Sequence, residues 1–167
     1  MSAPVLIPEG EVEARYRKVL RETEQGGYHL NPDAAFSKAL IHGIMVNERR
    51  YGYGACPCRL AGNDRPADLD IICPCYYRDP DLLQYGACYC ALYVSNTVFQ
   101  GLQPVPVVPE RRPPLEQRQK PAQLSVPGGL PFPVWRCRVC GYLCAREGPP
   151  EICPVCRASR DRFEKFF

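Results

Sequence analysis

Cysteine is the residue type in this sequence with the greatest capacity for chemistry. The chain holds eleven cysteines in 167 residues, and ten of them form five pairs separated by one or two residues. No basic stretch followed by a long apolar run marks the N-terminus as an export signal. An odd count with tight spacing in such a chain favours metal ligands or redox catalysts over structural disulfides.

The last two pairs follow a metal-binding spacing. Twelve residues separate the two CxxC motifs, whose cysteines are Cys137, Cys140, Cys153 and Cys156. Each CxxC turn directs two sulfurs at one ion, and two such turns complete a tetrahedron that fits zinc or iron. A segment of about 35 residues cannot bury enough core to fold alone, so the sequence predicts a metal centre. Cys144 lies outside the pattern and is expected to be a small buried apolar residue.

The residues around this second cluster resemble a rubredoxin domain. The resemblance rests on CRVCGY and CPVC, on Trp135 before the first motif and on the aromatic end at residues 162–166. The short gap between the motifs is similar to that of abbreviated rubredoxin modules fused to larger redox proteins. The resemblance implies one mononuclear iron, with a zinc ribbon as the alternative.

The central cysteines form three CxC motifs, separated by 14 and 12 residues. CxC motifs are unusual for zinc, whereas a cubane iron–sulfur cluster takes four thiolates. Six cysteines then leave two, which is the number that a redox-active disulfide needs. The spacing does not say which four would bind. The motifs are Cys56-Pro57-Cys58, Cys73-Pro74-Cys75 and Cys88-Tyr89-Cys90.

From about Tyr16 to Gln100 the chain resembles the catalytic subunit of ferredoxin:thioredoxin reductase, whose pattern is CPC…CPC…CHC. With the fused rubredoxin-like module, archaeal and bacterial ferredoxin:disulfide reductases are the more similar type. The resemblance implies an enzyme that takes single electrons from ferredoxin or a similar donor. It further implies that the substrate is the disulfide of a thioredoxin-like or glutaredoxin-like protein.

The same resemblance implies the roles of the six central cysteines. Cys58 would be the outer thiol that attacks the target disulfide, and Cys90 would be its partner beside the cluster. The [4Fe–4S] cluster would be held by the remaining four, which are Cys56, Cys73, Cys75 and Cys88.

Two neighbouring residues bear on this chemistry. Tyr89 stands where the family has histidine, and a phenol with a pKa near 10 is a poorer proton donor at neutral pH. Tyr89 is nevertheless the candidate for proton supply, beside water. Arg59 has two interpretations of equal weight: a solvated surface charge, or a cation that supports the Cys58 thiolate or a docking partner.

The elements that must position these motifs are mainly helical. Apolar spacing predicts a helix over residues 11–25 that ends at Gly26-Gly27. A second helix is expected from Asn31, as N-cap, to about Arg50, with an apolar stripe through Phe36, Leu40, Ile44 and Met45. Residues 91–99 could be a strand or a short helix.

These elements predict two domains and a connection. Residues 1–103 would form a small helical domain with cluster-binding loops, and residues 134–167 a rubredoxin-like knuckle domain with short β-strands. Residues 104–133 contain nine prolines and are predicted to be a stiff linker. The alternative is a proline-rich strand that wraps the first domain, since long unstructured loops are uncommon inside compact domains.

Composition excludes several partners and leaves two alternative functions. A net charge of +3 and the lack of a polybasic segment argue against nucleic acid, and no apolar run is long enough for a membrane helix. The sequence therefore predicts a soluble cytoplasmic protein. The alternatives to a reductase are an iron–sulfur electron carrier without disulfide chemistry and a zinc-binding interaction module.

Overall fold

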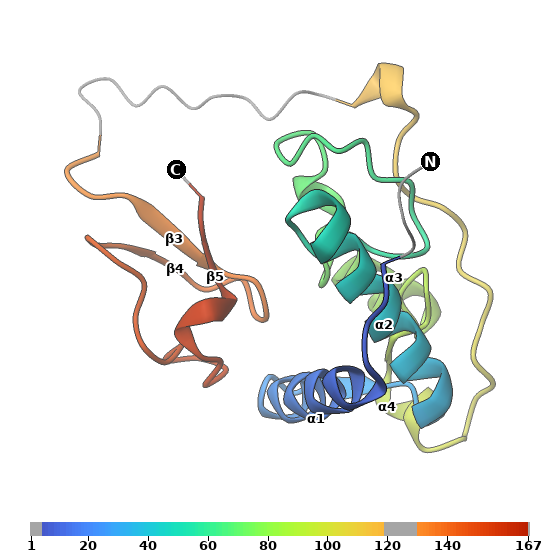
Figure 1. Ribbon diagram of the computed structural model, residues 1–167. Coiled ribbons are helices and arrows are strands. Elements are labelled where there is room, and N and C mark those ends of the chain that lie inside the picture. Colours follow the sequence, from blue (N-terminus) through green and yellow to red (C-terminus); the bar gives the residue numbers. More distant parts are fainter. Residues whose placement is uncertain (1–4, 119–129, 167) are drawn as a thin grey trace.

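A helical N-terminal part and a small C-terminal sheet make up the structure, a computed structural model that describes residues 5–118 and 130–166 (Figure 1). The predicted fold class, a mainly helical domain with a knuckle mini-domain of short strands, is confirmed. Within the described ranges, no helix combines the length and the apolar character needed to cross a lipid bilayer.

Two packed helices form the scaffold of the N-terminal part. Helix α1 (Glu9–Gln25) begins two residues before the expected position, and α2 spans Ala34–Tyr51. The backbone turns left-handed after each helix, at Gly27 (φ 77°) and at Gly52 (φ 76°), where glycine carries no Cβ penalty. Val12 and Val19 bury one face of α1 in the main core.

The start of α2 differs from the prediction. Its N-cap is Asp33, whose carboxylate accepts a hydrogen bond from the Phe36 N–H at 3.0 Å. Asn31, the predicted cap, instead accepts from the Asp33 N–H and donates from its amide to the Ala91 carbonyl, both at 3.0 Å. Asn31 therefore ties the helix to a cysteine-bearing turn, and capping passes to the next acidic side chain.

The buried face of α2 also differs from the predicted apolar stripe. Ser37, Ile41 and Met45 are buried, whereas Phe36 of the predicted stripe is 40% exposed. Leu40 and Ile44 are half-buried and pack at the margin of the same core. Buried Ser37 donates to the Asn31 carbonyl at 3.1 Å, which satisfies its hydroxyl, so a polar residue is tolerated at this position.

Short elements fill the space between the helices and the cysteines. Strand β1 (His29–Leu30) pairs antiparallel with β2 (Tyr93–Val94). The 3₁₀ helix η1 (Leu69–Ile71) and helix α3 (Arg78–Tyr85) flank the second CxC motif. Helix α4 (Asn96–Phe99) follows β2, so residues 91–99 contain both a strand and a short helix.

Residues 104–118 pack along the helical part, on the side away from the C-terminal sheet (Figure 1). Val108 is buried in a small core beside β2 and α4, and a 3₁₀ helix, η2, spans Leu115–Gln117. Arg112 is 7% exposed and reaches the carboxylates of Asp68 and Asp70. Residues 104–118 therefore contact the helical part along their length, while the division into two domains and a linker stays a prediction. Residues 119–129 of the predicted linker lie outside the described residues.

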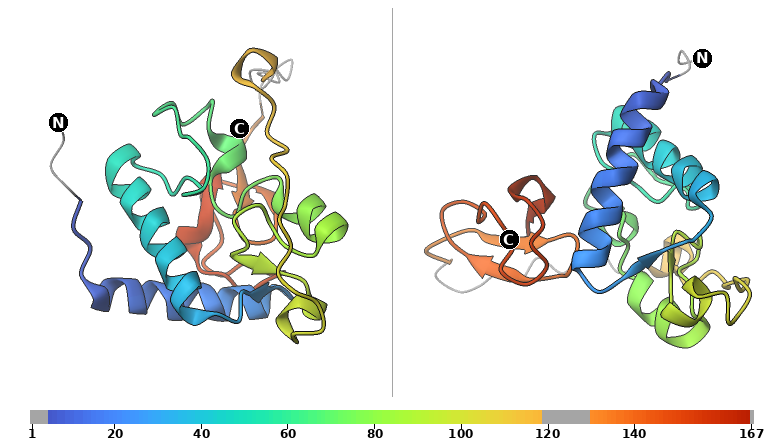
Figure 2. Two further views of the ribbon diagram at one scale, coloured as in Figure 1. Left: turned by 90° about the vertical axis from the view of Figure 1, so that its right-hand side faces the viewer. Right: turned by 90° about the horizontal axis from the view of Figure 1, so that it is seen from below.

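The C-terminal sheet has three antiparallel strands. Strand β3 (Val134–Cys137) lies between β4 (Leu143–Ala145) and β5 (Phe163–Lys165), which follows the 3₁₀ helix η3 (Arg160–Arg162). Four cysteines lie in its core with Val139, Ala158 and Phe163. Figure 2 shows this sheet beside the C-terminal end of α1.

Candidate active site and metal centre

The first two CxC motifs lie on adjacent backbone segments after α2. The Cys56 N–H donates to the Ile71 carbonyl at 2.8 Å, and the Cys73 N–H donates to the Gly54 carbonyl at 2.9 Å. The two segments therefore run antiparallel, which brings Cys56 close to Cys73 although the sequence separates them by 17 positions. Long-range pairing of this kind leaves no signal in local spacing.

A close approach to α2 fixes the turn of the first motif. A Cβ placed on Gly43 would lie 2.7 Å from the Cβ of Pro57, a distance that side-chain carbons do not tolerate. Pro57 lies between Cys56 and Cys58 in the sequence. Because glycine has no Cβ, position 43 lets Pro57 pack directly against α2. Gly43 was not among the predicted site residues; its signal in the sequence is an isolated glycine inside a helical pattern.

The third motif is closed into a tight turn before β2. The Cys88 N–H donates to the Tyr93 carbonyl at 2.9 Å, and the Ala91 N–H donates to the Cys88 carbonyl at 2.7 Å. Ala91 has a left-handed backbone (φ 54°), which reverses the chain directly after Cys90. The Tyr93 N–H also donates to the Cys88 sulfur at 3.3 Å.

The sulfurs of the first and third motifs meet. Those of Cys56, Cys58 and Cys90 all lie within 4.8 Å of one another, with Cys56 and Cys90 at 3.6 Å. The Cys88 sulfur lies 3.9 Å from that of Cys90. Cys58 is exposed, whereas Cys56, Cys88 and Cys90 are buried. The predicted pair, Cys58 and Cys90, is thus within reach of disulfide formation.

Cys73 and Cys75, both half-buried, complete the set from the second motif. Burial raises the pKa of Cys73, and the charges of Cys56, Cys75 and Cys88 raise it further. The division of the six into ligands (Cys56, Cys73, Cys75, Cys88) and a catalytic pair (Cys58, Cys90) stays a prediction.

Among these thiols, Cys58 ionises most readily. Hydrogen bonds from Cys56 and then from Cys90 lower the pKa of Cys58 to about 3. Hydrogen bonds with Cys56, and then with Cys58 and Cys88, raise the pKa of Cys90, because they favour the form that keeps its proton. The arrangement favours the thiolate form of the exposed Cys58. The thiolate is the form of cysteine that attacks disulfides.

Arg59 is buried beside this group rather than exposed on the surface. Its guanidinium binds the Glu110 carboxylate at 2.9 to 3.1 Å and donates to the Cys75 sulfur at 3.3 Å. Its guanidinium carbon lies over two rings, 4.8 Å from the centroid of Tyr77 and 4.5 Å from that of Tyr89. Arg59 thus supports a predicted ligand directly. Glu110 was missed, since nothing local in the proline-rich segment pointed to it.

Tyr89 contributes a stacking surface. Its half-buried ring is one of the two that enclose the Arg59 guanidinium, a favourable arrangement for a cation that is removed from water. Its predicted role in proton supply stays a prediction.

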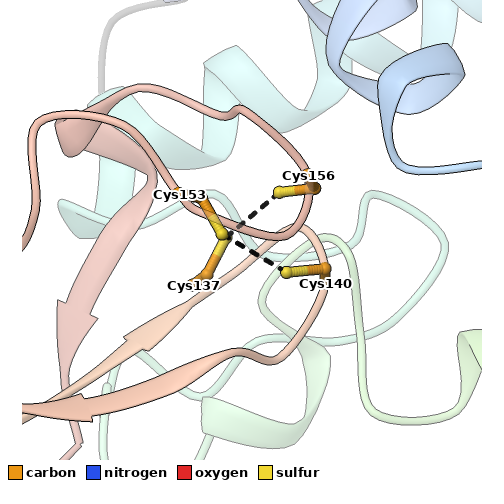
Figure 3. Close-up of side chains that lie close together, drawn as sticks. All are labelled: Cys137, Cys140, Cys153 and Cys156. Atoms are coloured by element: carbon orange, nitrogen blue, oxygen red, sulfur yellow. Dashed lines mark hydrogen bonds between the residues drawn. The ribbon is translucent and has the colours of Figure 1, made fainter.

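The four C-terminal cysteines converge as the spacing predicts (Figure 3). Four sulfurs bound to one ion at about 2.3 Å would lie about 3.8 Å apart. The sulfurs of Cys137 and Cys156 are 3.6 Å apart, as are those of Cys140 and Cys153. The donor set and its dimensions therefore fit one tetrahedral ion.

The two knuckles of this site have matching backbones. The Gly141 N–H donates to the Cys137 carbonyl at 2.9 Å, and the Arg157 N–H donates to the Cys153 carbonyl at 3.0 Å. Gly141 has φ 80°, as a knuckle glycine should, but Arg157 adopts φ 61° at the equivalent position. The second knuckle thus places a non-glycine residue in the left-handed region, which costs conformational energy.

Comparison with known families accounts for both sets of cysteines. The profile of the ferredoxin thioredoxin reductase catalytic beta chain matches residues 8–107. The chain belongs to this family. Residues 135–164 match the rubredoxin-like domain of rubrerythrin. A search of curated proteins finds no match to the chain.

Membership in the ferredoxin thioredoxin reductase family identifies the chain as an oxidoreductase, an iron–sulfur disulfide reductase that also carries a rubredoxin-like metal site. The predicted enzyme class is therefore confirmed. The match ends at residue 107, so Glu110 and Arg112 come from outside it although they pack against the matched domain.

The central residues fit an iron–sulfur cluster on chemical grounds. The sulfurs of Cys56, Cys58 and Cys90 lie within 4.8 Å of one another and that of Cys88 lies 3.9 Å from Cys90. Two predicted ligand sulfurs accept hydrogen bonds, Cys88 from the Tyr93 N–H and Cys75 from Arg59. Donors of this kind stabilise the negative charge of cluster-bound thiolates and tune the cluster. Nearby rings and core side chains limit the access of water.

Proposed function

We propose that the protein reduces the disulfide of a thioredoxin-like or glutaredoxin-like protein with electrons from ferredoxin or a similar one-electron donor. The observation that carries the proposal is the setting of Cys58. Of the six central cysteines it alone is exposed, and its sulfur lies within 4.8 Å of those of Cys56 and Cys90. A nucleophile needs such access to solvent together with a neighbouring thiol.

The thiol chemistry follows from this arrangement. Two electrons and two protons convert a Cys58–Cys90 disulfide into two thiols. The Cys58 thiolate then attacks the target disulfide, forms a mixed disulfide and releases one target thiolate. The buried Cys90 next attacks the Cys58 sulfur, releases the second target thiol and restores the internal disulfide. Cys90 is well placed to resolve the intermediate because its sulfur stays near that of Cys58.

We assign Cys56, Cys73, Cys75 and Cys88 to a [4Fe–4S] cluster. When bound, such a cluster supplies electrons one at a time beside the disulfide. Arg59 would then hold a positive charge against the Cys75 sulfur, and Tyr89 would keep that cation in place by stacking. Protons would reach the thiols from water at the exposed Cys58 or from the Tyr89 phenol.

We assign a mononuclear iron, with zinc as the alternative, to Cys137, Cys140, Cys153 and Cys156. Iron in this site would give the chain a second one-electron centre and a port for an external donor, whereas zinc would be structural. The match to a rubredoxin-like domain supports iron.

Serine substitution of Cys58 tests the proposal. The full chain, purified anaerobically, is assayed for reduction of a thioredoxin disulfide with reduced ferredoxin as donor. Cys58→Ser should abolish turnover while iron and acid-labile sulfide contents stay unchanged. Cys144→Ser is the matched control, because Cys144 is half-buried and lies outside both cysteine groups, and it should retain activity.

Two outcomes would contradict the proposed function. Full activity of Cys58→Ser would overturn the assignment of the nucleophile. If the wild-type chain showed no additional pair of alkylatable thiols after reduction, it would be an electron carrier without disulfide chemistry.

A further inference from the structure

The C-terminal sheet is docked against the helical part through side chains that are withdrawn from water. Glu22 near the end of α1 pairs with Arg162 at 3.1 Å, and both side chains are less than 10% exposed. The Arg162 Nε and the Glu22 Oε2 are within ion-pair distance but do not hydrogen-bond to each other. The burial of both side chains shows that the C-terminal sheet covers this end of α1. Two further contacts surround it: Lys18 with Asp161 at 2.5 Å, and the Arg136 guanidinium 4.4 Å from the Tyr76 ring centroid.

Arg78, the first residue of α3, lies in this contact and reaches the metal knuckle. It is 5% exposed, and its Nη1 donates to the Val139 carbonyl at 3.0 Å. Val139 lies between Cys137 and Cys140 in the sequence. The guanidinium therefore holds the turn that carries two of the four C-terminal sulfurs.

On its other side Arg78 contacts the central site. Its guanidinium carbon lies 3.8 Å from the ring centroid of Tyr28 and 5.4 Å from that of Tyr93. The Tyr93 backbone is bonded to Cys88 twice: its N–H donates to the Cys88 sulfur at 3.3 Å, and its carbonyl accepts from the Cys88 N–H at 2.9 Å. The Arg78 side chain and Tyr93 thus connect Val139 to Cys88.

The ion pair between Arg78 and Asp79 does not explain the burial of Arg78. Asp79 pairs with Arg78 at 2.7 Å, but the Asp79 side chain is 61% exposed. An ion pair with an exposed partner could form equally well at the surface, where the guanidinium would keep its hydration. The groups that require Arg78 to be buried are the Val139 carbonyl and the two tyrosine rings.

We propose that Arg78 is the positioning residue that couples the two redox centres, by holding the Val139 knuckle of the C-terminal site against Tyr93 and Cys88 of the central site. The inference rests on the proposed function. With iron and a cluster bound, electrons from an external one-electron donor would pass one at a time from the C-terminal site to the central site. Two such electrons, with two protons from water, would reduce the Cys58–Cys90 disulfide to two thiols.

The test compares Arg78→Gln and Arg78→Lys with Lys18→Gln in the iron-loaded full chain. Lys18 is the control because its ion pair lies at the partly exposed rim of the same contact. Rapid mixing with a one-electron donor follows reoxidation of the C-terminal iron through its visible charge-transfer band. We expect this internal transfer to slow about tenfold in Arg78→Gln, because loss of a charge-assisted hydrogen bond would lower the population of the docked arrangement by about that factor. Arg78→Lys should be intermediate and Lys18→Gln close to wild type.

Hydrogen exchange supplies a second measurement that is independent of turnover. Protection of backbone amides in residues 137–142 should fall by about tenfold in Arg78→Gln, with iron content and circular dichroism unchanged. If Arg78→Gln does not fold, Arg78→Lys carries both measurements. Wild-type internal transfer or wild-type protection in the variant that folds would overturn the proposal.

A low-potential chemical reductant separates this proposal from the proposed function. Such a reductant supplies the central site directly, so Arg78→Gln should then reduce the target disulfide at the wild-type rate. Failure of the wild-type chain under the same conditions would count against the disulfide reductase assignment, while hydrogen exchange would still decide the docking role of Arg78.

Discussion

Arg112→Met should destabilise the N-terminal domain by about 3 kcal/mol, the lower end of the cost of breaking a buried ion pair. The Arg112 guanidinium binds Asp68 at 3.0 Å and Asp70 at 2.9 Å, and also donates to the carbonyls of Leu60 and Ala67. Methionine has a comparable length but no charge, so both carboxylates would lose their cation.

The lower end applies because the carboxylates keep other donors. Asp68, 1% exposed, still accepts from the Tyr53 hydroxyl at 2.7 Å and from the Gly62 N–H at 2.6 Å. Asp70 still accepts from the Tyr77 hydroxyl at 2.7 Å. Partial compensation of this kind reduces the penalty of an uncompensated charge.

Anaerobic urea denaturation, followed by circular dichroism, measures the effect. With a slope of about 1–3 kcal/mol per molar urea, the midpoint should fall by about 1 to 3 M. Arg118→Met is the control, since Arg118 makes an exposed contact to the Pro113 carbonyl, and it should change stability by less than about 0.5 kcal/mol. Adding Asp68→Asn to Arg112→Met should recover part of the loss. A loss below about 1 kcal/mol would refute the view that residues 104–118 are an integral part of the domain.

Three further predictions concern the two cysteine sites. Arg59→Gln should lower the reduction potential of the central cluster by on the order of 50 mV in spectroscopic titration, because it removes a cationic donor from the Cys75 sulfur; an unchanged potential would contradict this. Cys137→Ser should abolish metal binding and ordered structure in residues 130–166, yet retain the sulfide content of the central site; retained metal would argue against the four-thiolate centre. Arg157→Gly should stabilise the C-terminal sheet by about 0.5–1 kcal/mol in urea denaturation, whereas Gly141→Ala should cost about 1 kcal/mol, because both positions have positive φ; equal effects of the two changes would refute the argument.

The C-terminal centre could be predicted almost completely from local spacing. Each CxxC turn is a short-range structure, and a tetrahedral ion requires two of them. The left-handed backbone conformation of Arg157 was not predicted, because an arginine gives no sign of such a conformation in the sequence. Cys144 on β4 is half-buried opposite Trp135, which partly fits its expected role as a small apolar residue.

The central site was harder to predict from the sequence, because it is assembled from segments that are distant along the chain. The two helices were predicted to within a few residues, yet the cap at Asp33 and the burial of Ser37 depend on contacts with the turn at Ala91. Glu110 and Arg112 were missed for the same reason. Proline content gave no indication that the charged side chains of their segment pair with buried partners.

Mapping of the redox-active disulfide tests the central claim most directly. The full chain is alkylated under anaerobic conditions before and after reduction by two electrons, and the modified cysteines are identified by mass spectrometry. We predict a Cys58–Cys90 disulfide in the oxidised chain and alkylation of both residues after reduction. A disulfide between Cys56 and Cys90, whose sulfurs lie 3.6 Å apart, or the absence of any reducible pair would contradict the assignment.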